Sequence, residues 1–241
     1  MTITVAQVEE HRRAIDGVAA LMERDLRDVW RSLDLSNPPA VQAFLEALLP
    51  ELGGVYQQQA AQVAADWYAD LRDQAGVPGV PRPRLAEPPP PERMEVLARW
   101  GVGPLWSSTP VVADAFTRLA GGMNKVVRGG ERDTIVASAE SDTSRTTWAR
   151  RASPGACAFC RMLALRGGTY TTEVSAGGGR LDRDYHDDCN CAVVPVHRGQ
   201  ELDAPSYQGP WQDAYDAATA AVGASDASAV LAHMRAAMGT H

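Results

Sequence analysis

The segments CAFC (residues 157–160) and YHDDCNC (residues 185–191) decide how the centre of this chain folds. The chain has 241 residues and four cysteines, and all four lie in these two segments, with His186 beside the second pair. A Cys-x2-Cys turn directs two sulfur atoms at one point, and zinc binds thiolate and imidazole ligands in a tetrahedron. The spacing therefore predicts a structural zinc site with the candidate ligands Cys157, Cys160, His186, Cys189 and Cys191.

Five candidate ligands exceed by one the four that a closed zinc site needs. The preferred set combines Cys157, Cys160 and His186 with either Cys189 or Cys191. Residues two apart on a straight strand point to opposite faces, so both of the last two bind one ion only if the chain turns there. The choice between them stays open.

Other states of the cysteines compete with structural zinc. The thiols could form two disulfides outside the cytosol, or stay free and merely be buried. A catalytic zinc is disfavoured, because the sequence contains no HExxH segment. Structural zinc is preferred because short, glycine-rich strands bury too little apolar surface to offset their ordering entropy. Metal binding, worth on the order of 10 kcal/mol, supplies the missing stability.

The fold class predicted around this segment is mainly α, with a small α+β, zinc-knuckle-like subdomain. Residues 1–75 form an N-terminal helical bundle, since apolar residues recur at helical spacing from Val5 to Leu33. Thr4 is expected to cap the first helix, and Asn37 with Pro38 to start the second. A third helix is expected after the glycine pair at residues 53–54.

A proline-rich stretch separates this region from the next, since proline fixes φ and lacks an amide proton. Residues 76–92 are therefore a linker or a strap on the surface. Helices are expected from Pro91 and from Thr109, with breaks at the glycine pairs 121–122 and 129–130 and a short helix near residues 131–140.

The following region, residues 93–200, contains the Cys/His knob at residues 145–196. Strands are expected at residues 146–148, 167–174 and 191–196, where β-branched and aromatic residues gather. The C-terminal tail, residues 201–241, is expected to form helices over 211–222 and 226–238, the second capped by Ser225.

The charge balance argues against a free nucleic-acid binder, which usually presents a basic face. The net charge is −7, from 23 Lys and Arg against 30 Asp and Glu. Arginines 145, 150, 151, 161 and 166 gather near the first cysteine pair and are read as a solvated, mixed-charge face. No apolar run is long enough to span a membrane and no secretory signal is evident, so synthesis in the cytosol is expected.

Residues 145–196 resemble the signature of the MuF-like phage head morphogenesis proteins, the minor capsid proteins of tailed phages, in their actinobacteriophage versions. The matching elements are Trp148, Cys157, Cys160, the turn MLALRGG, His186, Cys189, Cys191 and Pro195. The resemblance extends over about residues 90–200. Asp187 and Asn190 depart from the proline and arginine of the family pattern, which weakens any basic role for this loop but leaves the ligands intact.

The resemblance implies a virion protein inside the capsid, assembled in the host cytoplasm and associated with the portal or the inner capsid surface. Such a protein is present in several copies and aids head assembly, DNA packaging or DNA delivery, with no enzymatic activity expected. Two alternatives remain: a zinc-dependent nucleic-acid-binding module, with DNA contact through the arginines, and a component of a capsid maturation protease. For an enzyme in general, Cys157 is the candidate nucleophile with His186 as its base, but the sequence shows no nucleophile and base pair that fits a capsid maturation protease.

Several further residues receive structural interpretations. His11 and His233 are expected at helix surfaces or boundaries, and His197 is a weaker alternative to His186 as a ligand. The tryptophans at positions 67, 100, 106 and 211 are expected to anchor the core or helix contacts.

Overall fold

The computed structural model describes residues 1–172, 189–223 and 226–240, and in this part of the chain it confirms a mainly helical protein with small sheets. The helices are α1 (Val5–Ser32), α2 (Pro38–Gln74), α3 (Pro91–Val102), α4 (Val112–Ser141), α5 (Ala158–Ala164), α7 (Gly209–Val222) and α8 (Ala227–Met238). The strands are β1 (Thr2–Ile3), β2 (Thr147–Arg151), β3 (Ala192–Val196) and β4 (Glu201–Leu202). Short 3-10 turns cover Gly103–Trp106 and Ser206–Gln208.

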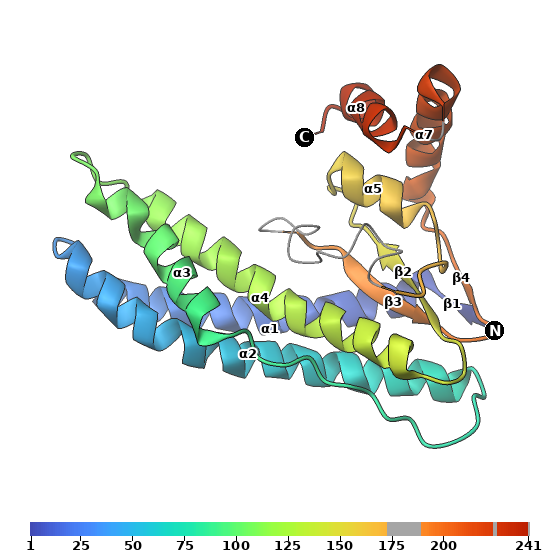
Figure 1. Cartoon of the computed structure of the whole chain (residues 1–241), viewed down its shortest axis with the longest axis horizontal. Helices are drawn as coiled ribbons and strands as arrows, with labels where there is room; N and C mark the ends of the chain where they lie inside the picture. Colours follow the sequence, from blue (N-terminus) through green and yellow to red (C-terminus); the bar gives the residue numbers. More distant parts are fainter. Residues whose placement is uncertain (173–188, 224–225, 241) are drawn as a thin grey trace.

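Helices α1 to α4 pack lengthwise into an elongated bundle, and the strands, α5, α7 and α8 gather at one end of it (Figure 1). The bundle core takes apolar residues from all four helices, including Met22, Leu26, Leu45, Leu49, Met94, Leu119 and Met123. Residues on both sides of the proline-rich stretch therefore share one core.

The starts of α1 and α2 agree with the sequence-based predictions. The backbone N–H of Gln7 donates to the Thr4 hydroxyl at 3.3 Å, and the backbone N–H of Thr4 donates to Gln7 Oε1 at 2.9 Å. The Asn37 side chain accepts from the N–H of Ala40 at 3.3 Å. These bonds satisfy amide groups that have no partner within the first helical turn.

Helix α2 runs unbroken through the glycine pair at residues 53–54, so the prediction of a separate third helix was wrong. Gly53 is buried, and a Cβ at this position would lie 2.8 Å from Met94 Cε. The glycine therefore allows α3 to approach α2 closely. Glycine in a helix interior is less favourable than alanine by about 1 kcal/mol, and this packing offsets that loss.

Helix α4 likewise continues through both glycine pairs, which were expected to break it. A Cβ at Gly122 would lie 2.2 Å from Leu97 Cδ1, and one at Gly130 would lie 2.2 Å from the carbonyl oxygen of Gln57. Both glycines thus mark helix contacts, which periodicity alone does not reveal.

Two predicted helix starts differ in the structure. Helix α4 starts at Val112, three residues after the predicted start at Thr109, and its cap Val111 makes no side-chain bond. Helix α8 is capped by Asp226, whose carboxylate accepts from the N–H of Ala229 at 2.9 Å. Ser225, the expected cap, lies outside the described residues.

The proline-rich stretch forms a strap along the bundle rather than a free linker. The N–H of Arg84 donates to the Ser138 hydroxyl at 2.9 Å, and the N–H of Ala86 donates to the Thr134 hydroxyl at 2.9 Å. Ser138 and Thr134 are buried in α4. Polar side chains on a buried helix face are therefore partners of the strap's backbone.

The knob is built on an antiparallel pair of β2 and β3, with Trp148 opposite Pro195. The strand predicted at residues 167–174 is reduced in the described residues to a bridge between Tyr170 and Trp148; positions 173–174 lie outside the description. At the N-terminus, β1 pairs in parallel with β4, with Thr2 opposite Glu201. None of the described helices is long and apolar enough to cross a membrane.

Several single-residue expectations need correction. His11 is buried, with its ring stacked on Trp67 at a centroid distance of 3.8 Å, so it is not a surface residue. Trp100 and Trp106 are 46% and 55% exposed and do not anchor the core, although the guanidinium of Arg118 in α4 lies 5.3 Å from the Trp100 ring and gives this residue the expected contact between helices. Trp211 is buried, as expected. His233 is exposed, also as expected.

Candidate metal centre

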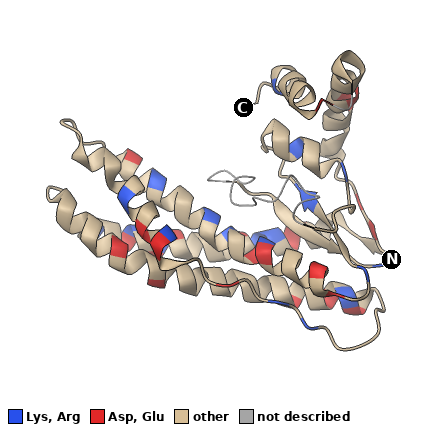
Figure 2. Cartoon of the chain, viewed as in Figure 1, with Lys and Arg blue, Asp and Glu red and all other residues tan. Residues whose placement is uncertain are grey.

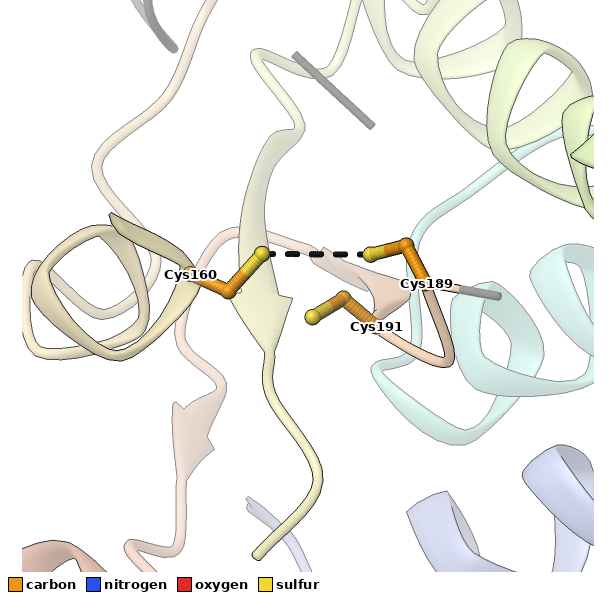
Figure 3. A group of neighbouring side chains, drawn as sticks. All are labelled: Cys160, Cys189 and Cys191. Atoms are coloured by element: carbon orange, nitrogen blue, oxygen red, sulfur yellow. Dashed lines mark hydrogen bonds between the residues drawn. The ribbon is translucent and has the colours of Figure 1, made fainter. Parts of the chain in front are cut away.

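Three buried thiols converge at the centre of the knob. Cys160 lies in α5, while Cys189 and Cys191 immediately precede β3. Figure 3 shows the three sulfur atoms pointing toward one another. The Sγ atoms of Cys160 and Cys189 are 3.8 Å apart, and all three lie within 4.8 Å of one another. The structure thus joins the two cysteine segments that the sequence places apart.

These separations fit a tetrahedral zinc–thiolate centre. A Zn–S bond of about 2.3 Å places two sulfur ligands of a tetrahedron about 3.8 Å apart. The Cys160–Cys189 separation equals this value. The described thiols are therefore spaced to hold a metal ion, and the four cysteines, all within the described residues, form no disulfide.

Both Cys189 and Cys191 reach the cluster, although strand alternation favoured only one of them. Strand β3 begins at Ala192, so neither cysteine lies in a straight strand. The chain turns at this point and brings both sulfurs toward Cys160 (Figure 3). The sequence allowed Cys189 and Cys191 to bind the same ion only if the chain turned between them, and the structure contains this turn.

Cys157 is half-buried at the N-terminal end of α5 and lines the same cavity as the three converging thiols. The cavity measures about 400 Å³. Its other lining residues are Ser153, Gly155, Ala156, Asn190, Gly239 and Thr240. His186, the fifth predicted ligand, lies outside the described residues. The structure therefore places Cys157 at the cavity beside the cluster, outside the three thiols that lie within 4.8 Å of one another, and it leaves the His186 prediction untested.

Hydrogen bonds among the thiols displace their pKa values in opposite directions. The pKa of Cys160 is raised because its thiol bonds with Cys157, Cys189 and Cys191. The pKa of Cys189 is lowered because its sulfur accepts from Cys160 and Cys191, and the positive charge of Arg132 adds to this. Deprotonation is therefore favoured at Cys189 over Cys160.

Arg132 of α4 binds the backbone of the second cysteine segment. Its Nε donates to the carbonyl oxygen of Cys191 at 3.0 Å, and a terminal nitrogen donates to the carbonyl oxygen of Cys189. The side chain is only 2% exposed. Helix α4 therefore shapes the turn that presents both sulfurs.

Glu131, the neighbour of Arg132, connects the same helix to β3. Its carboxylate accepts from the N–H of Val193 at 3.2 Å and lies 3.4 Å from His11 Nε2. Sequence reasoning missed both buried charges, because charged residues on a helix usually face water. The available signal was their position among buried residues of α4, one turn before Ile135 and Val136.

His197, the alternative ligand, has other contacts. Its Nδ1 shares a 2.9 Å hydrogen bond with the Thr146 hydroxyl, and its ring packs edge-on against Tyr68. Burial lowers the pKa of His197 to about 4. It does not belong to the thiol cluster of the described residues.

The arginines near Cys157 do not form one solvated face. Arg150 and Arg151 are buried, whereas Arg145 and Arg166 are exposed and Arg161 is half-buried. In Figure 2, Lys and Arg alternate with Asp and Glu along the long helices. The prediction of a shared mixed-charge surface was therefore wrong for the two arginines of β2.

Comparisons with known proteins assign most of the chain to one family. No curated protein and no solved structure matched the chain. The family described as VG15 protein matches residues 2–218, which include the bundle, the knob and α7 up to residue 218. The chain therefore belongs to the VG15 protein family.

Proposed function

We propose that this protein is a minor capsid protein of a tailed phage that acts in head morphogenesis at the portal. The resemblance of residues 145–196 to the MuF-like proteins supports this role. Several copies would lie inside the capsid of the mature virion, after assembly in the host cytoplasm. Zinc would brace the thiol cluster and give the knob a defined shape.

The observation that carries the proposal is an exposed apolar surface at the connection between α3 and α4. This α3–α4 tip consists of Trp100, Trp106, Val111 and Val112, which are all exposed. It lies at the far end of the bundle from the knob (Figure 1). Aromatic residues are enriched in the cores of protein interfaces, and water disfavours such a patch on a free surface.

The surroundings of the tip suit a protein partner as well. A groove of about 720 Å³ runs between α1 and α4 and includes Trp30, Phe116 and Arg27. The Arg27 guanidinium lies 4.5 Å from the centre of the Phe116 ring. Aromatic and arginine side chains of this kind often carry most of the energy of an interface. The resemblance to the MuF-like proteins implies the portal or the inner capsid surface as the partner, and of these we propose the portal protein.

The thiol cluster supports a bracing role rather than a catalytic one. Cys160, Cys189 and Cys191 are buried and their sulfur atoms lie within 4.8 Å of one another, whereas a nucleophilic thiolate needs partial exposure and an adjacent base. A DNA-binding module finds less support, because Arg150 and Arg151 are buried. The protease component remains an alternative that cleavage assays on head proteins would reveal.

The test is co-purification with the portal protein encoded by the same phage. We expect the full chain to form a complex of fixed stoichiometry, and the double variant Trp100→Ser/Trp106→Ser to lose it. Val80→Ser is the matched control, because Val80 is 80% exposed in the strap. Retention of the complex by the double variant, or its loss in the control, would contradict the proposed docking surface.

A further inference from the structure

We infer that the thiol cluster is a four-thiolate site for a soft divalent cation, closed by Cys157, with the buried guanidinium of Arg132 as its counter-charge. This inference deepens the proposed zinc bracing and rests on it. It differs from the sequence-based ligand set, since it includes both Cys189 and Cys191 and does not need His186.

The geometry leaves one corner of the tetrahedron for Cys157. Three corners are supplied by sulfurs within 4.8 Å of one another, at Cys160, Cys189 and Cys191. Cys157 is three positions before Cys160 and caps α5, so both side chains lie on one side of its first turn. The Cys157 side chain borders the cavity that these thiols line.

The cavity also supplies an entry path for the ion. It measures about 400 Å³ and is lined by small residues, such as Gly155, Ala156 and Gly239. A site assembled from preformed ligands needs such a path. A softer cation, with a preference for sulfur over oxygen, is favoured because all the donors are thiolates.

Charge explains the position of Arg132. Four thiolates around a divalent cation carry a net charge of −2, and burying this charge without compensation is costly. The guanidinium of Arg132 is itself buried and bonds to the backbone of both Cys189 and Cys191. It therefore reduces the net charge of the site and orients two of the ligands in one step.

The planar guanidinium of arginine can bind two carbonyl oxygens at once, which the single ammonium group of lysine does less well. Two nitrogens of Arg132 reach two carbonyl oxygens that belong to residues two apart. A lysine keeps the charge but lacks the planar arrangement of donors. Because Arg132 belongs to α4, binding of the cation is coupled to the docking of the knob on the bundle.

Cobalt substitution in the full chain tests the ligand set, because the Co²⁺ absorption spectrum reports the number of thiolate ligands. We expect His186→Ala to keep the spectrum and zinc affinity of the parent protein. Cys157→Ser should shift the spectrum to one with fewer thiolates and lower the zinc affinity more than tenfold. The opposite pattern, a shift in His186→Ala and none in Cys157→Ser, would overturn the inference.

Zinc competition titrations test the role of Arg132. We expect Arg132→Met to weaken zinc binding by 10- to 100-fold, the usual range for groups that support metal ligands, and Arg132→Lys to weaken it less. Arg128→Met is the matched control, since Arg128 is buried one turn earlier and bonds to Asp16 instead. Equal losses at positions 132 and 128 would show a merely structural role and overturn the inference.

The outcomes distinguish failure of the ligand set and the Arg132 counter-charge from failure of the proposed zinc bracing and portal role. If Arg132→Met does not fold, Arg132→Lys decides: unchanged zinc affinity and an unchanged cobalt spectrum would overturn the counter-charge role. A parent protein that binds neither zinc nor cobalt would refute the zinc bracing as well. Portal co-purification is measured independently, so its failure leaves the ligand set intact.

Discussion

The helical bundle and the cysteine knob reach a defined structure in different ways. In the bundle, α1 to α4 bury large apolar residues such as Leu45, Leu49 and Met123 completely. Each buried side chain of this kind contributes about 1.5–3 kcal/mol. The knob instead buries thiols beside a small apolar cluster, and the backbone of its cysteine turn is held by a charged side chain of α4. Apolar burial suffices for the first region, and the second depends on polar contacts and, in our proposal, on a bound metal ion.

The largest expected effect comes from removing metal from the knob. Binding energy on the order of 10 kcal/mol would be lost, so chelation should unfold the knob and leave the bundle folded. Hydrogen exchange should accelerate at residues 147–164 and 189–196 and stay slow in the centre of α2.

Cys160→Ser should reproduce this pattern without a chelator, because it removes a buried thiol of the cluster. Equal acceleration in the core of α2 would mean that the two regions unfold as one unit, against the comparison drawn above.

Gly130→Ala should produce the next largest effect, and it acts on the bundle. A Cβ at this position would lie 2.2 Å from the carbonyl oxygen of Gln57, so α2 and α4 must separate. We expect a loss of about 3 kcal/mol in the free energy of unfolding, measured with urea.

Gly129→Ala is the control for that substitution, because its nearest neighbour is Asp133 Oδ2 at 3.9 Å. It should be neutral or gain up to about 1 kcal/mol from helix propensity. Similar losses at positions 129 and 130 would refute close packing as the reason for Gly130.

His197 should make the stability of the knob–bundle contact depend on pH. Burial lowers its pKa to about 4 from 6.5, while Asp142 acts to raise it and Arg72 to lower it. The unfolded chain therefore binds the proton more readily, and stability present above pH 6.5 is lost as pH falls toward 4. Between pH 7 and pH 5 we expect a loss of about 2 kcal/mol.

The measurement is urea unfolding of the parent and of His197→Asn at both pH values. Asparagine keeps a polar atom near Thr146 but does not titrate, so this part of the pH dependence should disappear. His233→Asn changes an exposed histidine and should leave the dependence as it is. Identical pH dependence in parent and His197→Asn would show that His197 does not cause it.

The smallest effect on stability is expected at the α3–α4 tip. Trp106 is 55% exposed, so Trp106→Ser should change the unfolding free energy by no more than about 0.5 kcal/mol. Thermal unfolding of the free protein measures this. A large destabilisation would mean that the tip supports the bundle and is not available to a partner.

Local chemistry explains which elements the sequence predicted well. Thr4 and Asn37 are followed by helical spacing, and both cap helices in the structure. Val193, Val194 and their neighbours favour a strand, and β3 forms there. The prolines of residues 78–90 exclude helix, and the strap follows. These features depend on neighbours within a few residues, which the sequence shows directly.

Contacts between residues distant in the sequence explain why some of the sequence-based predictions were wrong. The glycines of α2 and α4 look like helix breaks until Met94, Leu97 and Gln57 are seen against them. His11 looks like a surface residue until the ring of Trp67 covers it.

The cysteine spacing by itself determined that a thiol cluster was to be expected, because ligand type and spacing are local properties of the chain. Only the tertiary structure decided that Cys189 and Cys191 both join Cys160, and that Arg132, 57 residues before Cys189, holds their backbone. The physical reason is that a buried guanidinium needs hydrogen-bond acceptors, and the acceptors of Arg132 are close in space but distant in the sequence. That partner comes from the packing of α4 against the knob, which no short stretch of sequence records.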